Sequence, residues 1–176
     1  MSESERKAVY RVKIRGTVDD VWRELTRTDR PQYAMFNSVM HFNALAAGGQ
    51  LRMRSPNGKY TGVAGRFVEV TRPVLLSHTL RFTNYDDPEC TIVYDLKEIP
   101  EGVELTLTVE DLPTGTKSEK QLKQGGPFIV KNLKAVVETG RPTLGARLLF
   151  VLFKLLAPFN PESTRSENWP LPGTGS

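Results

Sequence analysis

The side chains best suited to chemistry at neutral pH are scarce in this chain of 176 residues. It contains two histidines, His41 and His78, and a single cysteine, Cys90. One cysteine can neither close an internal disulfide nor supply a thiolate-rich metal site, and two histidines without a suitably spaced carboxylate form no metal motif. Neither a Ser–His–Asp order nor a phosphate-binding loop accompanies them. The sequence therefore predicts no metal, no cofactor and no catalytic constellation.

Of the two histidines, only His78 lies in a pattern that predicts the direction of its side chain. It lies in phase with Leu76, Leu80 and Phe82 in an alternating stretch, so we expect its ring to point into a core. An inward imidazole can act as an acid or base, or can orient a ligand through a hydrogen bond. A core histidine satisfied by a neighbouring strand is the simpler interpretation, because no partner carboxylate can be identified. Both interpretations stay open.

The other reactive groups have simpler explanations. Cys90 starts a strand and is expected to be a small buried hydrophobic residue rather than a reactive thiol. The acidic residues of the same region alternate with apolar ones, which is typical of the wet outer face of a sheet. These are Asp95, Glu98, Glu104 and Glu110.

Composition and charge narrow the function classes. The hydrophobic fraction of 39%, the charged fraction of 25% and the net charge of +4 are those of an ordinary globular domain. The cationic residues are scattered and do not alternate with aromatics, so we expect no nucleic-acid partner. The polar N-terminal residues 1–7 and the lone cysteine favour a cytoplasmic location.

The elements that must position these residues follow from hydrophobic periodicity. We expect a strand at 8–15, a helix at 17–27, a second short helix at 29–36 and then a series of strands joined by short turns. Those strands are expected at 39–46, 50–54, 60–70, 75–82, 90–99 and 103–110. Short connections favour an antiparallel meander. After a polar lead-in at 117–124, an amphipathic helix is expected from Pro127 to a stop at residues 139–142.

This order predicts an α+β fold, with a curved antiparallel sheet of about seven strands, two short helices, and one long C-terminal helix over the concave face. One helix rarely fills such a concavity, so the remaining space is expected to be a pocket. The residues expected to line it are Tyr33, Phe36, His78, Leu80, Tyr94, Ile129 and Leu133.

Several motifs carry a resemblance to a known family. They lie at 17–22 (TVDDVW), 60–62 with 69–73, 90–96 (CTIVYDL) and 132–134 with 138–140. In these stretches the chain resembles the START-related (SRPBCC-type) helix-grip superfamily, and within it the branch homologous to the activator of the heat-shock protein 90 ATPase. The resemblance implies a cavity that binds a hydrophobic or amphipathic small molecule. A co-chaperone-like protein-binding module and a cyclase- or dehydratase-type enzyme using His78 are the alternatives.

The segment Leu144–Leu156 lies outside that resemblance. It carries only Arg147 and Lys154 as charges, so most of its circumference is apolar. We expect a helix that packs on its own domain or on a second subunit, with a peripheral membrane contact as the third reading. The chain thus divides into a ligand-binding domain at 8–142, an apolar helical extension at 143–160 and a flexible tail at 161–176.

Overall fold

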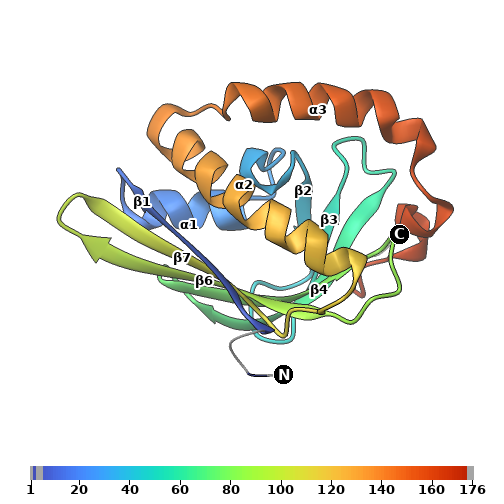
Figure 1. The fold of residues 1–176 in the computed structure, drawn as a ribbon, viewed down its shortest axis with the longest axis horizontal. Helices are drawn as coiled ribbons and strands as arrows, with labels where there is room; N and C mark the ends of the chain where they lie inside the picture. The colour runs from blue at the N-terminus through green and yellow to red at the C-terminus, as the bar shows by residue number, and fades with distance from the viewer. Residues whose placement is uncertain (1, 3–5, 174–176) are drawn as a thin grey trace.

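The computed structural model describes residue 2 and residues 6–173, which form one curved sheet with helices on its concave face (Figure 1). The sheet has seven strands: β1 (Ala8–Ile14), β2 (Val39–Phe42), β3 (Gln50–Arg54), β4 (Thr61–Thr71), β5 (Leu75–Phe82), β6 (Cys90–Ile99) and β7 (Gly102–Glu110). The helices are α1 (Val18–Thr26), α2 (Lys117–Thr139) and α3 (Leu144–Leu156), with 3-10 turns η2 (Tyr33–Met35), η3 (Ala157–Phe159), η4 (Glu162–Thr164) and η5 (Ser166–Asn168). The predicted α+β helix-grip architecture is confirmed.

The strands form an antiparallel meander in the order β1-β7-β6-β5-β4-β3-β2. After β1 the chain crosses to the opposite edge of the sheet through α1 and η2, and it then returns strand by strand to β7. Thr17 caps α1 and exchanges hydrogen bonds with Asp20 in a capping box. This crossover places α1 and η2 on the face that α2 also covers.

The sheet bends where β4 meets its neighbours. Register shifts occur beside Met53 in β3 and between Phe67 and Glu69 in β4, and such bulges increase the local twist. At Gly65 a Cβ atom would lie 2.0 Å from the carbonyl oxygen of Thr79, so only glycine permits this close approach of β4 to β5. The bend produces the hollow face that the helices cover.

Helix α2 lies across that hollow face (Figure 1). Its buried apolar residues join the inward side chains of β5, β6 and β7 in one core. These helix residues are Leu122, Val130 and Leu133. Burial of this stripe fixes the helix on the sheet.

The start of α2 differs from the prediction. The helix begins at Lys117, capped by Thr116, and continues through Pro127 rather than starting there. At Gly126 a Cβ atom would lie 2.2 Å from the Tyr10 ring, so the glycine lets that ring rest against the helix. Pro127 has no N–H for the carbonyl of Lys123, and the Tyr10 hydroxyl donates a long 3.5 Å hydrogen bond to that oxygen. Contacts with β1 therefore sustain a helix that its local sequence would break.

Two further predicted elements are shorter in the structure. The strand expected at 39–46 ends at Phe42, because the Asn43 side chain accepts the Gln50 N–H and turns the chain. The helix expected at 29–36 reduces to η2, because Phe36 and Asn37 adopt positive φ angles of 54° and 61° that end it.

A tight corner joins α2 to α3. Gly140 ends α2 in the left-handed conformation, and Thr143 caps α3 by accepting the Ala146 N–H. The buried Asn132 side chain accepts hydrogen bonds from both the backbone N–H and the hydroxyl of Thr143. The bounds predicted for α3 are confirmed. Among the described residues no single helix is long and apolar enough to cross a bilayer. Helix α2 and the helical segment 144–159 reach the required length and apolar composition only when taken together, and the two are bent by 112° at the break between them.

Candidate functional site

A row of aromatic side chains runs along the concave face beneath the helices. Phe42 meets Phe67 edge-on at 5.7 Å between ring centroids, and Phe67 meets His78 edge-on at 6.5 Å. The His78 ring then stacks on Tyr94 at 6.1 Å. The row therefore joins β2, β4, β5 and β6, and it places two of the three predicted polar site residues, His78 and Tyr94, next to each other.

His78 is the polar centre of this row. Its Nδ1 lies 2.8 Å from the carbonyl oxygen of Thr79. Because a carbonyl only accepts, Nδ1 carries the hydrogen in the neutral ring and Nε2 is the acceptor. Burial lowers the pKa of His78, which keeps the ring neutral at physiological pH. Within the described chain Nε2 has no hydrogen-bond partner.

Tyr94 is the second polar group on this face. Its hydroxyl donates only to the sulfur of Met35 in η2, at 3.7 Å, and a thioether is a weak acceptor. Burial raises the pKa of Tyr94, so the phenol stays protonated. Two hydrogen-bonding groups with spare capacity thus lie side by side in an apolar surrounding.

A second group of aromatic residues, here called the aromatic cluster, joins η2, α2 and α3. It consists of Tyr33, Phe36, Phe128, Phe150 and Phe153. Phe36 stacks on Phe128 with centroids 4.2 Å apart, and Tyr33 stacks on Phe150 at 6.3 Å. Phe153 and Phe150 approach Phe36 and Phe128 at 6.5 Å. The aromatic cluster is thus the contact through which α3 covers the helices.

The structure separates the predicted pocket residues into groups. His78 and Tyr94 lie in the aromatic row, and Tyr33 and Phe36 lie in the aromatic cluster. Leu133 is 0% exposed in the core, whereas Leu80 and Ile129 are half-buried against it. Met35 contacts Tyr94 from η2, so this turn stands between the two aromatic groups.

Sequence reasoning missed several aromatic residues of both groups. Phe42 and Phe67 could have been found from strand alternation, but a bulge in β4 interrupts its phase. For Phe128, Phe150 and Phe153 the sequence indicates only that the side chains are apolar. Their contacts in the aromatic cluster depend on how α3 folds back over α2.

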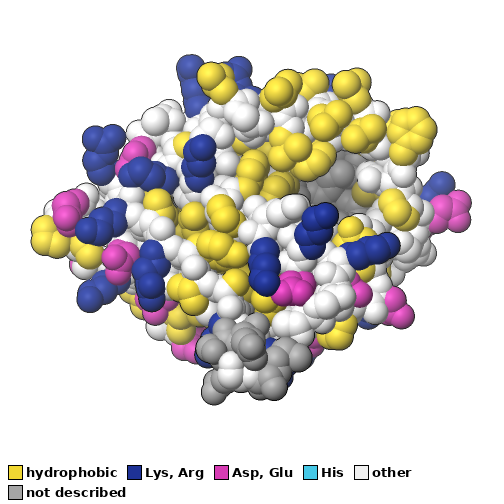
Figure 2. Space-filling model, viewed as in Figure 1, with side chains coloured by type: hydrophobic (Ala, Val, Ile, Leu, Met, Phe, Trp, Pro, Cys, Tyr) yellow, Lys and Arg dark blue, Asp and Glu magenta, His cyan; other side chains and the backbone are white. Residues whose placement is uncertain are grey.

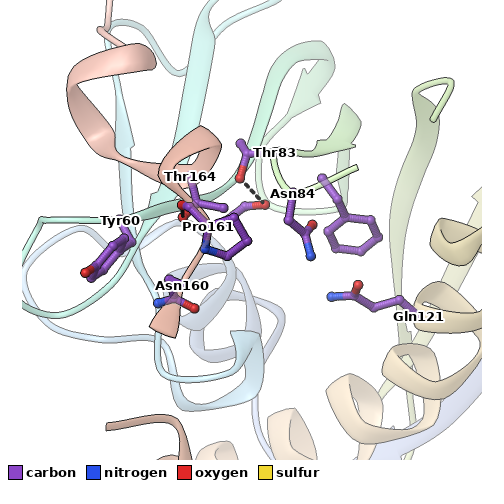
Figure 3. A pocket seen from close by; sticks show the side chains of 9 residues that line it. Tyr60, Thr83, Asn84, Gln121, Asn160, Pro161 and Thr164 are labelled. Carbon is purple, nitrogen blue, oxygen red and sulfur yellow. Dashed lines mark hydrogen bonds between the residues drawn. The ribbon is translucent and has the colours of Figure 1, made fainter. Parts of the chain in front are cut away.

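A pocket of about 150 Å³ opens at the end of β5 (Figure 3). Its wall combines the ends of β4 and β5, Gln121 of α2 and the segment that follows α3. The lining residues are Tyr60, Gly62, Phe82, Thr83, Asn84, Gln121, Asn160, Pro161 and Thr164. The Thr83 hydroxyl donates to the carbonyl oxygens of Thr61 and Gly62 and so braces the two strands at this opening.

The segment after α3 does not match the expected flexible tail. Residues 161–173 are held by two arginines of β3. Arg52 donates a hydrogen bond to the Pro170 carbonyl and Arg54 donates one to the Trp169 carbonyl, both at 3.1 Å. Leu171 is 8% exposed, and Arg165 pairs with Tyr60 at the edge of β4. This part of the tail is therefore bound to the sheet, and residues 174–176 of the prediction lie outside the described residues.

The remaining candidates of the sequence occupy separate places. His41 lies half-buried on β2, where burial and the nearby Arg54 lower its pKa, and it does not meet His78 on β5. Cys90 is 2% exposed, and burial raises the pKa of its thiol to about 12, so it carries no thiolate at neutral pH. Within the described residues no three His, Cys, Asp or Glu side chains converge as a metal site.

These features define a helix-grip protein of the START-related (SRPBCC) superfamily. Within it, the chain belongs to the family described as "Activator of Hsp90 ATPase homolog 1-like protein", which matches residues 15–138. The match includes the sheet from β2 to β7 and nearly all of α2, and it leaves α3 and the bound tail outside. A search of curated proteins gave no match.

Solved structures share this fold. Protein MLL2253 from Mesorhizobium loti is 19% identical with a TM-score of 0.62, and the match covers 75% of this chain and 96% of that one. DynU16, from the dynemicin biosynthetic locus, is 25% identical with a TM-score of 0.61 over 78% of this chain and 49% of DynU16. PFC0360w, an HSP90 activator from Plasmodium falciparum, is 16% identical with a TM-score of 0.55, covering 68% and 86%.

Proposed function

We propose that this protein binds a hydrophobic or amphipathic small molecule between the concave face of the sheet and α2. The observation that carries the proposal is the change in burial along the inner face of β5. Phe82 lines the pocket and is half-buried, as is Leu80, whereas His78 is 6% exposed and Leu76 is 1% exposed. This row of side chains leads from an opening at the surface to the polar pair in the interior.

The chemistry of the interior end selects the ligand class. Nε2 of the neutral His78 accepts a hydrogen bond, and the Tyr94 hydroxyl donates one to a better acceptor than a thioether. We assign the apolar walls to Leu133 of the hydrophobic core and to Leu80 and Ile129, which pack against that core. This combination suits a ligand with an apolar body and a hydroxyl or similar group at its buried end, which is the common pattern of small-molecule sites.

Occupation requires the site to widen, because the pocket of about 150 Å³ is smaller than the roughly 300–1,000 Å³ of typical ligand sites. We place this widening at the aromatic cluster. Tyr33 and Phe36 are half-buried, and α3 has Ala146 as its one buried residue among the described positions. We therefore assign Tyr33 and Phe36 to the outer wall of the site.

Native mass spectrometry of the protein as purified, followed by organic extraction, tests the proposal. A bound apolar compound is expected in the wild type. It should be absent from Leu80→Trp, because the larger ring would block the proposed route from Phe82 to His78. Leu144→Trp, at a side chain that is 79% exposed, is the matched control and should retain the compound. Equal amounts of bound compound in Leu80→Trp and Leu144→Trp would show that the ligand does not bind along β5.

A second function is a co-chaperone-like module that binds a protein partner, which the family match over residues 15–138 favours. Stimulation of a purified heat-shock protein 90 ATPase by excess protein would support this co-chaperone function, and an unchanged ATPase rate would exclude it. We favour binding over a cyclase- or dehydratase-type reaction. Among the described residues His78 contacts a carbonyl and aromatic rings but no carboxylate that would complete an acid–base pair.

A further inference from the structure

The surface of α3 that faces away from the domain is unusually apolar. Among the described residues eleven large hydrophobic side chains are exposed, and eight of them lie between Leu144 and Phe159. Leu144, Leu148 and Leu155 are 79%, 73% and 68% exposed. Figure 2 shows hydrophobic side chains gathered along α3 at the upper margin of the molecule, with no acidic side chain among them in this view.

Helical spacing shows that this is a second face, distinct from the one that packs on the domain. Ala146, Phe150 and Phe153 recur on the inner side and meet the domain. The outer residues recur at intervals of three and four around the opposite side. They are Leu144, Leu148, Val151, Leu152 and Leu155, followed by Phe159 of η3. For simplicity we call this set the outer face of α3.

The charges beside the outer face have one sign. Arg147 and Lys154 are seven residues apart and therefore lie along one flank of the helix. Both are exposed, and neither has an ion-pair partner within the described chain. No acidic residue occurs in the sequence between Glu138 and Glu162.

This charge pattern disfavours a second copy of the chain as the occupant. Two copies of α3 packed antiparallel about a two-fold axis would bring the same flank of each helix together. Arg147 and Lys154 of both copies would then line one edge, with no carboxylate on α3 to neutralise them. An anionic surface, in contrast, complements a cationic flank along the whole helix.

We propose that the outer face of α3 docks on an anionic lipid bilayer, with its apolar side chains in the headgroup–acyl boundary and Arg147 and Lys154 toward lipid phosphates. At 1.5 Å per residue the helix is roughly 20 Å long, which is too short to span the roughly 30 Å hydrocarbon core, so it lies along the surface. An interfacial helix usually has a broad polar face turned to water. Here the domain itself occupies that side, because the inner face of α3 packs on Tyr33, Phe36 and Phe128.

Flotation of the full chain with vesicles tests the proposal. Vesicles of phosphatidylcholine with phosphatidylglycerol should carry the protein, and pure phosphatidylcholine should carry much less of it. The double variant Leu148→Glu/Leu155→Glu should weaken binding by at least roughly a hundredfold, because two leucines that would enter the bilayer are lost and two anions are added. Arg147→Ala and Lys154→Ala should each weaken binding to anionic vesicles by about fivefold.

The matched control is Val9→Glu/Val68→Glu, which adds the same charges at exposed apolar positions on the sheet and should bind as the wild type does. The thermal unfolding midpoint of every variant shows whether it is folded. Absence of the wild type from the anionic vesicles, or undiminished flotation of folded Leu148→Glu/Leu155→Glu, would overturn the proposal. A wild-type dimer that becomes monomeric in that variant while no form floats would assign the outer face to a second copy instead.

Discussion

The rings of Phe36 and Phe128 stack with centroids 4.2 Å apart and planes 10° from parallel, joining η2 to α2 directly beneath α3. Both rings are half-buried. Phe128→Ala should therefore lower the free energy of unfolding by about 2 kcal/mol, less than a fully buried phenylalanine because part of the ring is already in water. Leu148→Ala, at an exposed residue of α3, should change it by no more than about 0.5 kcal/mol. Urea denaturation measures both, and equal values would show that the stack does not join the elements.

Gly126 and Gly145 provide a paired test of helix packing. Gly126→Ala forces the new methyl group against the Tyr10 ring, whereas a Cβ at Gly145 meets no atom within 4 Å. Overpacking costs about 1–3 kcal/mol and outweighs the gain of up to about 1 kcal/mol in helix propensity. We expect Gly126→Ala to destabilise the protein and Gly145→Ala to stabilise it slightly. In a Tyr10→Ala background Gly126→Ala should become neutral or stabilising; persistence of the full loss there would exclude the ring as the cause.

Much of the fold could be predicted because its signals are local. Strand alternation placed β3, β5 and β6 at their observed bounds, and the helix stop at 139–142 together with the apolar run after it placed α3. The start of α2 was missed because Gly125, Gly126 and Pro127 predict a break, and only the contacts of Tyr10 explain the continuous helix. The inward strand positions of His78 and Tyr94 were predicted and the two rings lie side by side, but their role in ligand binding stays a prediction. The aromatic cluster depends on the 112° angle between α2 and the helix that follows, and that angle has no sequence signature.

The bound tail is another feature without a local signal, since Arg52 and Arg54 hold backbone carbonyls rather than particular side chains. Leu171→Ala removes the tail's buried anchor, and we expect faster trypsin cleavage after Arg165 together with faster hydrogen exchange across 161–173. Phe159→Ala, at a side chain that is 81% exposed, should change neither rate. If the wild type is cleaved as fast as the Leu171 variant, the tail is flexible in solution, as expected from the sequence.

Glu138 predicts a specific acid sensitivity. Its carboxylate accepts hydrogen bonds from Lys134 Nζ at 2.7 Å and from the Arg15 backbone N–H at 2.9 Å, and these bonds lower its pKa from 4.5 to about 2. A carboxyl pKa that is lower in the folded state contributes stability above pH 4.5, which is lost as the pH falls toward 2. The free energy of unfolding of Glu138→Gln should therefore fall less over this window than that of the wild type. Glu98→Gln, at an exposed carboxylate without a hydrogen bond in the described chain, should follow the wild-type profile.

We propose that an apolar ligand enters along β5 toward His78 and Tyr94 and does not adhere to α3. A fluorescence titration with a conjugated polyene fatty acid tests it most directly, using the wild type, Leu80→Trp and Leu148→Glu/Leu155→Glu. We expect saturable one-to-one binding to the wild type, the same affinity in the α3 variant, and an affinity lower by at least roughly tenfold in Leu80→Trp. Loss of binding in the α3 variant with full affinity in Leu80→Trp, or no saturable binding to the wild type, would contradict it.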